Sequence, residues 1–225
     1  MKISQHMSRP ALTVPPELSI SQARELLRSR DFRHLPVVDD SGILLGMVTD
    51  RDLRSAYPSS VLGIAEGKAR LEELARTTVS TIMSRTTFTL PVAATLDDAL
   101  LLLDREQVGA LPVVDEANRV VGIFSIRDLT RAYRTLFGLG ERGSAMLTLL
   151  DDGQPRPLSR LCAALEQADI HFNRLLKAEA EDGCKIIYLR VNTYNLAAVH
   201  RIVTAAGFEQ HREAAASQPE GEVPA

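Results

Sequence analysis

The chain repeats itself, and this internal duplication constrains its fold more than any other feature. A shift of 76 residues (83 − 7) aligns residues 7–57 with residues 83–133 without a gap. The longest shared string is LPVVD, which begins at Leu35 and again at Leu111. Repetition over such a length indicates two copies of one supersecondary unit. A single copy would expose an apolar sheet face, so we expect its twin to cover that face.

Each copy carries the same expected order of elements. A capping box, S-x-x-Q at Ser19 and T-x-x-D at Thr95, opens a helix. Two strands rich in Val, Ile and Leu follow, joined by the turn sequences DDSG and DEAN. A last helix begins near Asp50 in the first copy and near Ile126 in the second. The expected unit is therefore short strand, helix, strand, strand, helix.

The remaining segments complete a chain that we predict to be α/β (α+β). Residues 144–211 carry the order βαββαβ, which is typical of a ferredoxin-like domain. Residues 212–225 are predicted to be disordered, because they have too little apolar content to be buried. The expected divisions are an N-terminal segment (1–6), a first repeat (7–57), a linker helix (58–82), a second repeat (83–134), a linker (135–143), the C-terminal domain (144–211) and the tail (212–225).

Charge and apolar patterning exclude several functional classes. Lys and Arg number 26 against 29 Asp and Glu, for a net charge of −3, so the chain lacks the basic footprint of a protein that binds nucleic acid or an anionic membrane. No apolar run approaches the roughly 18 to 20 residues of a membrane span. The first ten residues lack the apolar stretch of a secretory signal. We therefore predict a cytoplasmic protein with neither nucleic acid nor a membrane as partner.

The sequence also lacks the usual signs of catalysis. Cys162 and Cys184 have no metal-ligand spacing, and the histidines form no HxH or HExxH motif. We find no assignable Ser/His/Asp or Cys/His set and no glycine-rich phosphate loop. We predict that the protein is not an enzyme, binds no metal and requires no cofactor.

The chemistry of the repeats lies where the second strand runs into the last helix. Thr49 and Asp52 in the first copy, and Ser125 and Asp128 in the second, place a hydroxyl and a carboxylate on the first helical turn. Free N–H groups and the positive end of the helix dipole favour an anion at such a junction, and phosphate is the usual one. We expect the hydroxyl to meet a phosphate and the carboxylate to accept hydrogen bonds from ribose hydroxyls.

Two arginines lie next to these hydroxyl and carboxylate groups. A structural interpretation of the groups, as helix caps, stays open beside the phosphate-binding one. Arg51 and Arg127 can pair with phosphate oxygens. The hydroxyl and the acid can equally form a capping box that contributes about 1 kcal/mol of helix stability with no ligand. Both interpretations predict the same local geometry at the helix start.

The repeated pattern resembles the CBS domain, which occurs as tandem pairs that form a Bateman module. The residues that carry the resemblance are LPVVD with GMVTDRD (46–52) and LPVVD with GIFSIRD (122–128). The resemblance implies a regulatory module that binds an adenosyl nucleotide, either AMP, ADP, ATP or S-adenosylmethionine, between the repeats. The site residues that it implies are Asp52 and Asp128 toward ribose, Thr49 and Ser125 toward phosphate, and Thr13, Thr89, Arg33, His34, Gly109 and Ala110 near adenine.

The adenine-side residues differ between the copies. Arg33 and His34 are bulky and polar, whereas Gly109 and Ala110 leave space. The two sites are therefore not expected to bind the same ligand with equal affinity.

Residues 144–211 resemble an ACT domain, a regulatory fold that senses amino acids. Tandem CBS repeats followed by such a domain are similar to the AcuB-type acetoin-utilisation regulatory proteins. This resemblance implies a homodimer that regulates an enzyme or transporter, in acetoin or central carbon metabolism. An alternative is a ligand-independent dimerisation or scaffold module that docks to a metabolic enzyme. A third, an accessory of a nucleotide enzyme, would need a catalytic barrel of about 200 additional residues.

Overall fold

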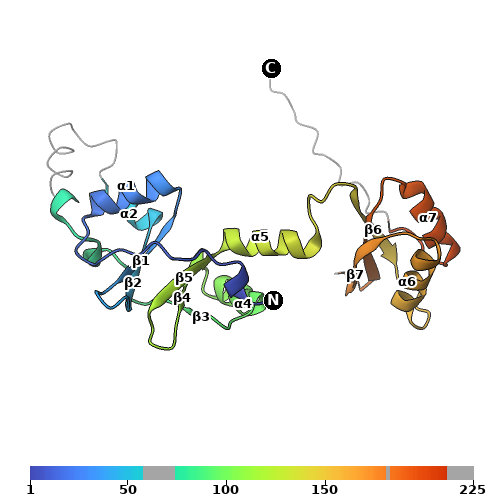
Figure 1. Ribbon diagram of the computed structural model, residues 1–225, viewed down its shortest axis with the longest axis horizontal. Coiled ribbons are helices and arrows are strands. Elements are labelled where there is room, and N and C mark those ends of the chain that lie inside the picture. Colours follow the sequence, from blue (N-terminus) through green and yellow to red (C-terminus); the bar gives the residue numbers. More distant parts are fainter. Residues whose placement is uncertain (58–73, 181–182, 212–225) are drawn as a thin grey trace, which may run out of the picture. The chain divides into compact units, whose positions relative to one another are not determined.

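A computed structural model describes residues 1–57, 74–180 and 183–211 of the chain (Figure 1). The chain divides into two compact units, Met1–Tyr133 and Arg134–Ala225. The first unit contains both repeats, and the second contains the C-terminal domain. Most of the predicted linker helix and the whole predicted tail lie outside the described residues.

The first repeat folds as its sequence pattern predicts. Its elements are α1 (Ile20–Arg30), β1 (His34–Val38), β2 (Leu44–Thr49) and α2 (Asp50–Ala56). The Ser19 side chain accepts a hydrogen bond from the Gln22 amide, which closes the predicted capping box. The short first strand is reduced to a single parallel bridge between Val14 and Val37.

The second repeat reproduces this arrangement with one more formal strand. Its elements are η2 (Val79–Thr81), β3 (Leu90–Pro91), α4 (Leu96–Arg105), β4 (Ala110–Val114), β5 (Val120–Ser125) and α5 (Ile126–Phe137). Strands β3, β4 and β5 form one sheet in that order, with the β3–β4 pair parallel. Each hairpin bulges at the same place, between Val37 and Val38 and between Val113 and Val114. The duplication therefore preserves the backbone register as well as the sequence.

The two repeats exchange their N-terminal segments. Ile3, in η1 (Ile3–Gln5), lies fully buried in the core of the second repeat, while Val79 of η2 is buried in the core of the first. These two residues are also 76 apart (79 − 3), so the structural repeat begins before the expected start at residue 7. The predicted N-terminal segment 1–6 is thus part of the folded unit, because its apolar side chain completes a core.

Short backbone bridges fix this exchange. Ser84 and Met47 trade two N–H···O hydrogen bonds of 2.9 Å each, and Ser8 and Ile123 do the same at 3.0 and 3.1 Å. At both bridges a glycine on the adjoining strand, Gly46 or Gly122, lets the exchanged segment approach closely. The prediction that each copy covers the other thus takes a specific form, in which each supplies part of the other's core.

The C-terminal unit is an antiparallel sheet with two helices on one face. Its elements are β6 (Ser144–Leu150), α6 (Pro157–Gln167), β7 (Phe172–Glu179), β8 (Lys185–Asn192) and α7 (Leu196–Ala205). The strand order is β6-β8-β7. Leu161 and Val199 of the two helices belong to one buried cluster with Leu149 and Leu189 of the sheet.

The predicted final strand of this unit is only partly present. A single antiparallel bridge joins Gln210 to Leu149, beside β6. Phe208, expected at the start of that strand, is instead buried in the core. The order of elements is otherwise the expected one, and Asn195 caps α7 as predicted, accepting from the Ala198 amide at 3.1 Å.

Candidate functional site

A cavity opens at each of the two helix entrances that the sequence singles out in the first unit. The cavity beside Thr49 and Asp52, called here the Asp52 cavity, has a volume of about 440 Å³. The cavity beside Ser125 and Asp128, called here the Asp128 cavity, has a volume of about 340 Å³. Both volumes fall within the range of small-molecule sites.

Each cavity draws its walls from both repeats. The Asp52 cavity is closed by Gly109 and Ala110 of the second repeat, and the Asp128 cavity by Arg33 and His34 of the first. These four residues, predicted to lie near adenine, line both cavities, so they form a shared wall. Arg51 lines the Asp52 cavity, and Arg127 the Asp128 cavity, as their positions in the repeat require.

Two predicted site residues lie elsewhere. Thr13 and Thr89 are not among the residues that line either cavity. Thr13 precedes Val14, whose backbone is held by β1, and Thr89 precedes β3. Both residues therefore lie beside the short first strands and outside the lining of the two cavities.

The Asp52 carboxylate both caps α2 and lines the cavity. Its Oδ2 accepts hydrogen bonds from the Thr49 amide at 2.8 Å and from the Thr49 hydroxyl at 2.7 Å. The Thr49 hydroxyl in turn accepts from the Asp52 amide at 3.3 Å. Oδ1 takes no part in this capping box, so it remains to accept hydrogen bonds from a ligand. The capping and binding interpretations of this acid are therefore compatible.

The second junction repeats this geometry in a more buried form. Oδ2 of Asp128 accepts from the Ser125 amide at 2.9 Å and from the Ser125 hydroxyl at 2.7 Å. Asp128 is only 3% exposed, and its Oδ1 lies 3.3 Å from a guanidinium nitrogen of Arg131. A ligand in this cavity would share Oδ1 with Arg131.

The helix starts do not offer the set of free N–H groups that the sequence suggested. At α2, the capping box occupies the amides of Thr49 and Asp52, and the Asp50 amide donates to the Arg33 carbonyl at 2.9 Å. At α5, the Ile126 amide likewise donates to the Gly109 carbonyl at 3.1 Å. The hydroxyls are also engaged with the acids, so an anion here would depend mainly on arginine side chains.

The shared wall is tightly packed around one histidine. A Cβ added to Gly109 would lie 3.0 Å from both Cε1 and Nε2 of His34, so the imidazole fills the space that the glycine leaves. Burial, and secondarily the charge of Arg33, lower the pKa of His34 below its ordinary value, against a smaller opposing effect of Asp52. His34 is therefore neutral at pH 7 and forms a compact partition between the two cavities.

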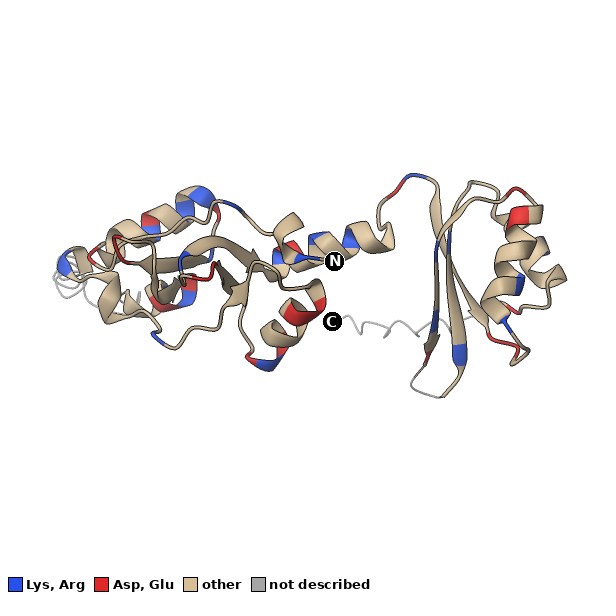
Figure 2. Cartoon of the chain, turned by 60° about the horizontal axis from the view of Figure 1, so that its bottom comes forward, with Lys and Arg blue, Asp and Glu red and all other residues tan. Residues whose placement is uncertain are grey.

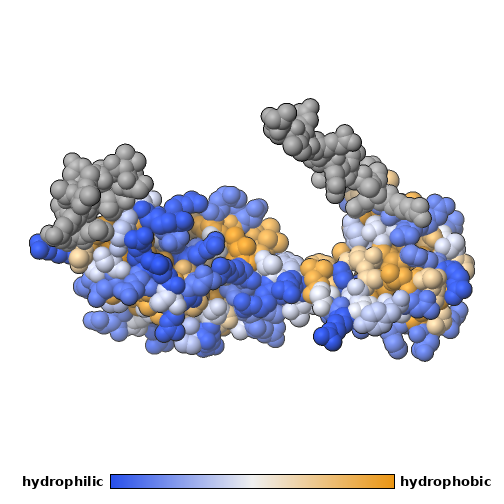
Figure 3. All heavy atoms as spheres, turned by 90° about the horizontal axis from the view of Figure 1, so that it is seen from above, coloured by the Kyte–Doolittle hydropathy of each residue, from blue (hydrophilic) through white to orange (hydrophobic). Residues whose placement is uncertain are grey.

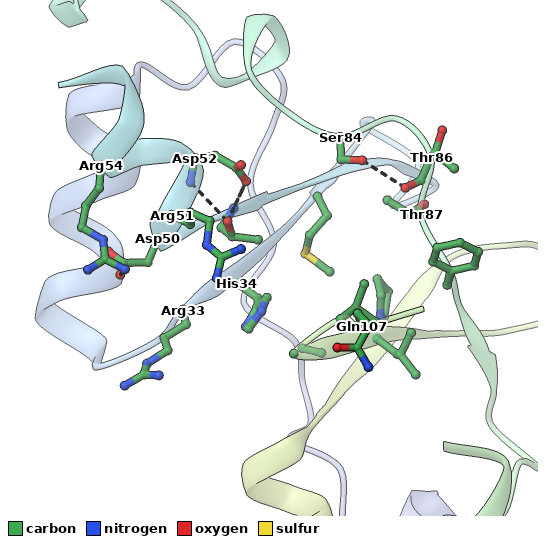
Figure 4. Close-up of a pocket in the computed structure, with 18 residues that line it drawn as sticks. Arg33, His34, Asp50, Arg51, Asp52, Arg54, Ser84, Thr86, Thr87 and Gln107 are labelled. Atoms are coloured by element: carbon green, nitrogen blue, oxygen red, sulfur yellow. Dashed lines mark hydrogen bonds and ion pairs between the residues drawn. The ribbon is translucent and has the colours of Figure 1, made fainter. Parts of the chain in front are cut away.

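Figure 4 shows the Asp52 cavity from within. Asp50, Arg51 and Asp52 project from the start of α2 on one side, and Gln107 faces them from the second repeat. Asp50 is paired with Arg54 at 2.8 Å.

Several lining residues were not among the predicted site residues. In the Asp52 cavity they include Asp50, Arg54, Ser84, Thr86, Thr87 and Gln107, and in the Asp128 cavity they include Ser8, Pro10, Leu12, Asp31, Phe32 and Arg131. Ser8 and Ser84 belong to the repeated MSR string, which could have indicated them. Pro10, Leu12, Thr86 and Thr87 lie on the exchanged segments, whose position no local pattern indicates, whereas Asp50, Arg54 and Arg131 lie on the predicted helices.

Two other kinds of site find no support in the parts of the chain that the structure describes. In residues 1–57, 74–180 and 183–211, no group of three or more His, Cys, Asp or Glu side chains could hold a metal ion. None of the helices in those ranges has the length and apolar character needed to span a membrane. Basic and acidic side chains are interspersed along the helices of each unit (Figure 2).

Sequence comparison connects both repeats to known proteins. The model of the CBS domain matches residues 3–59 and 79–135. A CBS domain-containing protein of Dictyostelium discoideum is 35% identical over 127 residues, which are 56% of this chain and 87% of that protein. The inosine-5'-monophosphate dehydrogenase of Thermoplasma acidophilum is 31% identical over 121 residues, 54% of this chain, but these span only 21% of that enzyme.

Solved structures of CBS pairs are similar to the first unit. The CBS domain pair of protein MJ0100, in complex with 5'-methylthioadenosine and S-adenosyl-L-methionine, has a TM-score of 0.50 at 26% identity and covers 60% of this chain and 98% of its own. CBSX2 of Arabidopsis thaliana in complex with AMP has a TM-score of 0.51 at 26% identity, covering 60% and 98%. A Vibrio cholerae structure assigned to the acetoin utilization protein AcuB has a TM-score of 0.52 at 26% identity, covering 63% and 96%.

These comparisons agree with the geometry of the first unit. Two copies of the same fold face each other, each with a capped acid beside a cavity. The expected tandem CBS pair, or Bateman module, is confirmed. The chain belongs to the CBS domain family.

Proposed function

We propose that the chain is a non-catalytic sensor that binds adenosyl nucleotides in the cavities between its CBS repeats. One observation carries this proposal: each cavity pairs a carboxylate, Asp52 or Asp128, with a wall supplied by the other repeat. A ligand held by both parts necessarily responds to their relative arrangement. The ligands in the solved structures of related pairs, which are AMP, 5'-methylthioadenosine and S-adenosylmethionine, support the adenosyl class.

The chemistry of each cavity suits a nucleoside. The free Oδ1 of Asp52 can accept hydrogen bonds from two vicinal ribose hydroxyls, which is the pattern that distinguishes ribose from most small molecules. The shared wall, with Gly109 and Ala110, offers a narrow apolar surface for the flat base. Binding changes a partner's activity only if the ligand has different affinities for two arrangements of the repeats, with a coupling of about 1–3 kcal/mol.

Thermal unfolding and calorimetry with a nucleotide panel test this function. AMP, ATP, S-adenosylmethionine and 5'-methylthioadenosine are titrated into the full chain, and at least one is expected to raise the melting temperature. The double variant Asp52→Ala/Asp128→Ala is expected to lose the response. Asp98→Ala is the matched control, because Asp98 caps α4 in the same way but lines neither cavity. If none of the four compounds shifts unfolding at millimolar concentration, the sensor function is excluded.

We further propose that the C-terminal unit is an ACT-like regulatory domain, which either dimerises or senses an amino acid. The order of its elements and the antiparallel order β6-β8-β7, with Gln210 bridging beside β6, support this assignment. Equilibrium dialysis of the full chain against an amino-acid panel separates the sensing role from pure dimerisation. The regulated enzyme or transporter, and a place in acetoin or central carbon metabolism, rest on the similarity to the AcuB structure.

A homodimer is part of this proposal, and exposed apolar side chains favour it. Leu101 on α4 is 69% exposed and its neighbour Leu100 is 39% exposed. Apolar patches interrupt the otherwise hydrophilic surface in Figure 3. Leu101→Asp is expected to shift the sedimentation coefficient toward that of a monomer. If wild-type and variant chains both sediment as monomers, the dimer and the ligand-independent scaffold fail together.

A further inference from the structure

We infer that the two cavities take different classes of adenosyl ligand. The geometry points to a nucleotide with a 5'-phosphate in the Asp52 cavity and to an uncharged thioether nucleoside in the Asp128 cavity. This inference rests on the proposed function and specifies the ligand class of each site.

The arginine two residues after the capping residue, Arg51 or Arg127, is paired differently in the two cavities. The Arg51 side chain lies on the wall of the Asp52 cavity. Its guanidinium makes no hydrogen bond or ion pair with any residue that the structure describes, so it is available to a phosphate. Its counterpart Arg127 donates to Asp31, 3.0 Å from Oδ2 and 3.3 Å from the carbonyl. A phosphate in the Asp128 cavity would have to displace this carboxylate and then remain beside it.

The other arginine of each cavity, Arg54 or Arg131, also has a different partner. Arg54 pairs with Asp50 in the Asp52 cavity, and this acid is separate from the one that faces ribose. In the Asp128 cavity, Arg131 pairs with Asp128 itself. In the described structure, Arg127 and Arg131 of the Asp128 cavity therefore both pair with a carboxylate. Arg33 lies on the shared wall and belongs to both cavities.

Side chains other than the arginines also differ between the two cavities. At two positions that correspond through the shift of 76 residues, a polar side chain of the Asp52 cavity is replaced by an apolar one in the Asp128 cavity. Thr86 corresponds to Pro10, and Asp50 corresponds to Ile126. Val108 corresponds to the larger Phe32, which is 46% exposed at the rim of the Asp128 cavity. An apolar rim raises the cost of desolvating a doubly charged phosphate, and it suits a methylthio group.

Isothermal titration of the full chain with AMP and with 5'-methylthioadenosine tests the inference. Arg51→Gln is expected to raise the dissociation constant for AMP about tenfold, because it removes a charge-assisted hydrogen bond. The same variant should leave 5'-methylthioadenosine within about twofold of the wild type. Phe32→Ala should do the reverse, raising the constant for 5'-methylthioadenosine about fivefold through lost apolar contact.

Two further measurements complete the design. Arg105→Gln is the matched control, since this exposed arginine lines neither cavity and pairs only with its neighbour Glu106 among the described residues. In the wild type, saturating AMP should leave a second binding event for 5'-methylthioadenosine. Arg51→Gln weakening both ligands alike, or AMP abolishing 5'-methylthioadenosine binding, overturns the inference while the sensor function stands. Failure of the wild type to bind either compound counts against the sensor function itself.

Discussion

The Asp52 and Asp128 cavities share one backbone design, one wall and one capping acid each, and they differ in how their arginines are paired. Hairpin register, bulge, capping box and segment exchange are the same in both repeats. Among the described residues, the Arg51 side chain has no partner in one cavity, whereas Arg127 pairs with Asp31 in the other. The capping acids and the arginines were retained after duplication, whereas the pairing of the arginines and several neighbouring side chains diverged. A duplicated module can thus acquire a second specificity without a second fold.

The largest expected effect on stability comes from the two glycines that contact the exchanged segments. A Cβ at Gly46 would lie 2.7 Å from the Ser84 carbonyl oxygen, a backbone atom held by the bridge to Met47. At Gly122 the nearest atom is the Met7 sulfur at 2.9 Å, which can move. We expect Gly46→Ala to lower the free energy of unfolding by about 2–3 kcal/mol and Gly122→Ala by about 1 kcal/mol. Urea denaturation measures both, and an equal or larger cost for Gly122→Ala contradicts the comparison.

The capping acids give the next largest difference. Asp128→Ala removes a buried carboxylate that holds both the Ser125 amide and Arg131, whereas Asp52 is only partly buried. We expect costs of about 2 kcal/mol for Asp128→Ala and about 1 kcal/mol for Asp52→Ala in the unliganded protein. Chemical denaturation without nucleotide isolates this structural part. Should the two costs be equal, burial does not distinguish the two caps.

The hairpin turns carry different residues at their left-handed position, and this difference gives a smaller effect. Gly42 adopts φ +80° and Asn118 adopts φ +58°, both in the left-handed region. Nothing lies within 4 Å of a Cβ placed on Gly42, so Gly42→Ala is penalised by the backbone alone. We expect a loss of about 1 kcal/mol for Gly42→Ala and a change within a few tenths for Asn118→Gly. Thermal unfolding of the two variants in parallel measures the difference.

The sequence predicted the shared design well and the differences poorly, for a physical reason. Caps, turns and strand periodicity are local, so Ser19, Asp52 and the DDSG turn could be recognised from neighbouring residues. The lining depends on residues brought together from distant segments. Asp31 reaches Arg127 across 96 positions, and no local pattern indicates that pair. The predicted free N–H groups at the helix starts are reduced in number, because the capping box uses the Asp52 amide and the shared wall uses the Asp50 amide.

The shared wall gives the smallest effect and the most specific test, because position 34 is where the copies differ most. His34 corresponds to Ala110, and its pKa is lowered mainly by burial and then by Arg33. The unfolded chain therefore binds a proton near the ordinary value of 6.5, whereas the folded chain binds it only at a lower pH. Stability should fall as pH drops below 6.5, in addition to the contribution of other groups. His34→Ala, which installs the residue of the second repeat, should reduce this slope between pH 7 and 5.5.

The same variant also joins the two cavities, which connects the pH test to ligand binding. Without the imidazole, the space beside Gly109 opens from both sides. Urea midpoints for wild type and His34→Ala across this pH window, with His200→Ala as a control on exposed α7 surface, give the comparison. A parallel pH dependence in the wild type and His34→Ala would mean that the imidazole titrates equally in both states. The partition would then be a solvated side chain, and the two cavities could not be kept distinct by it.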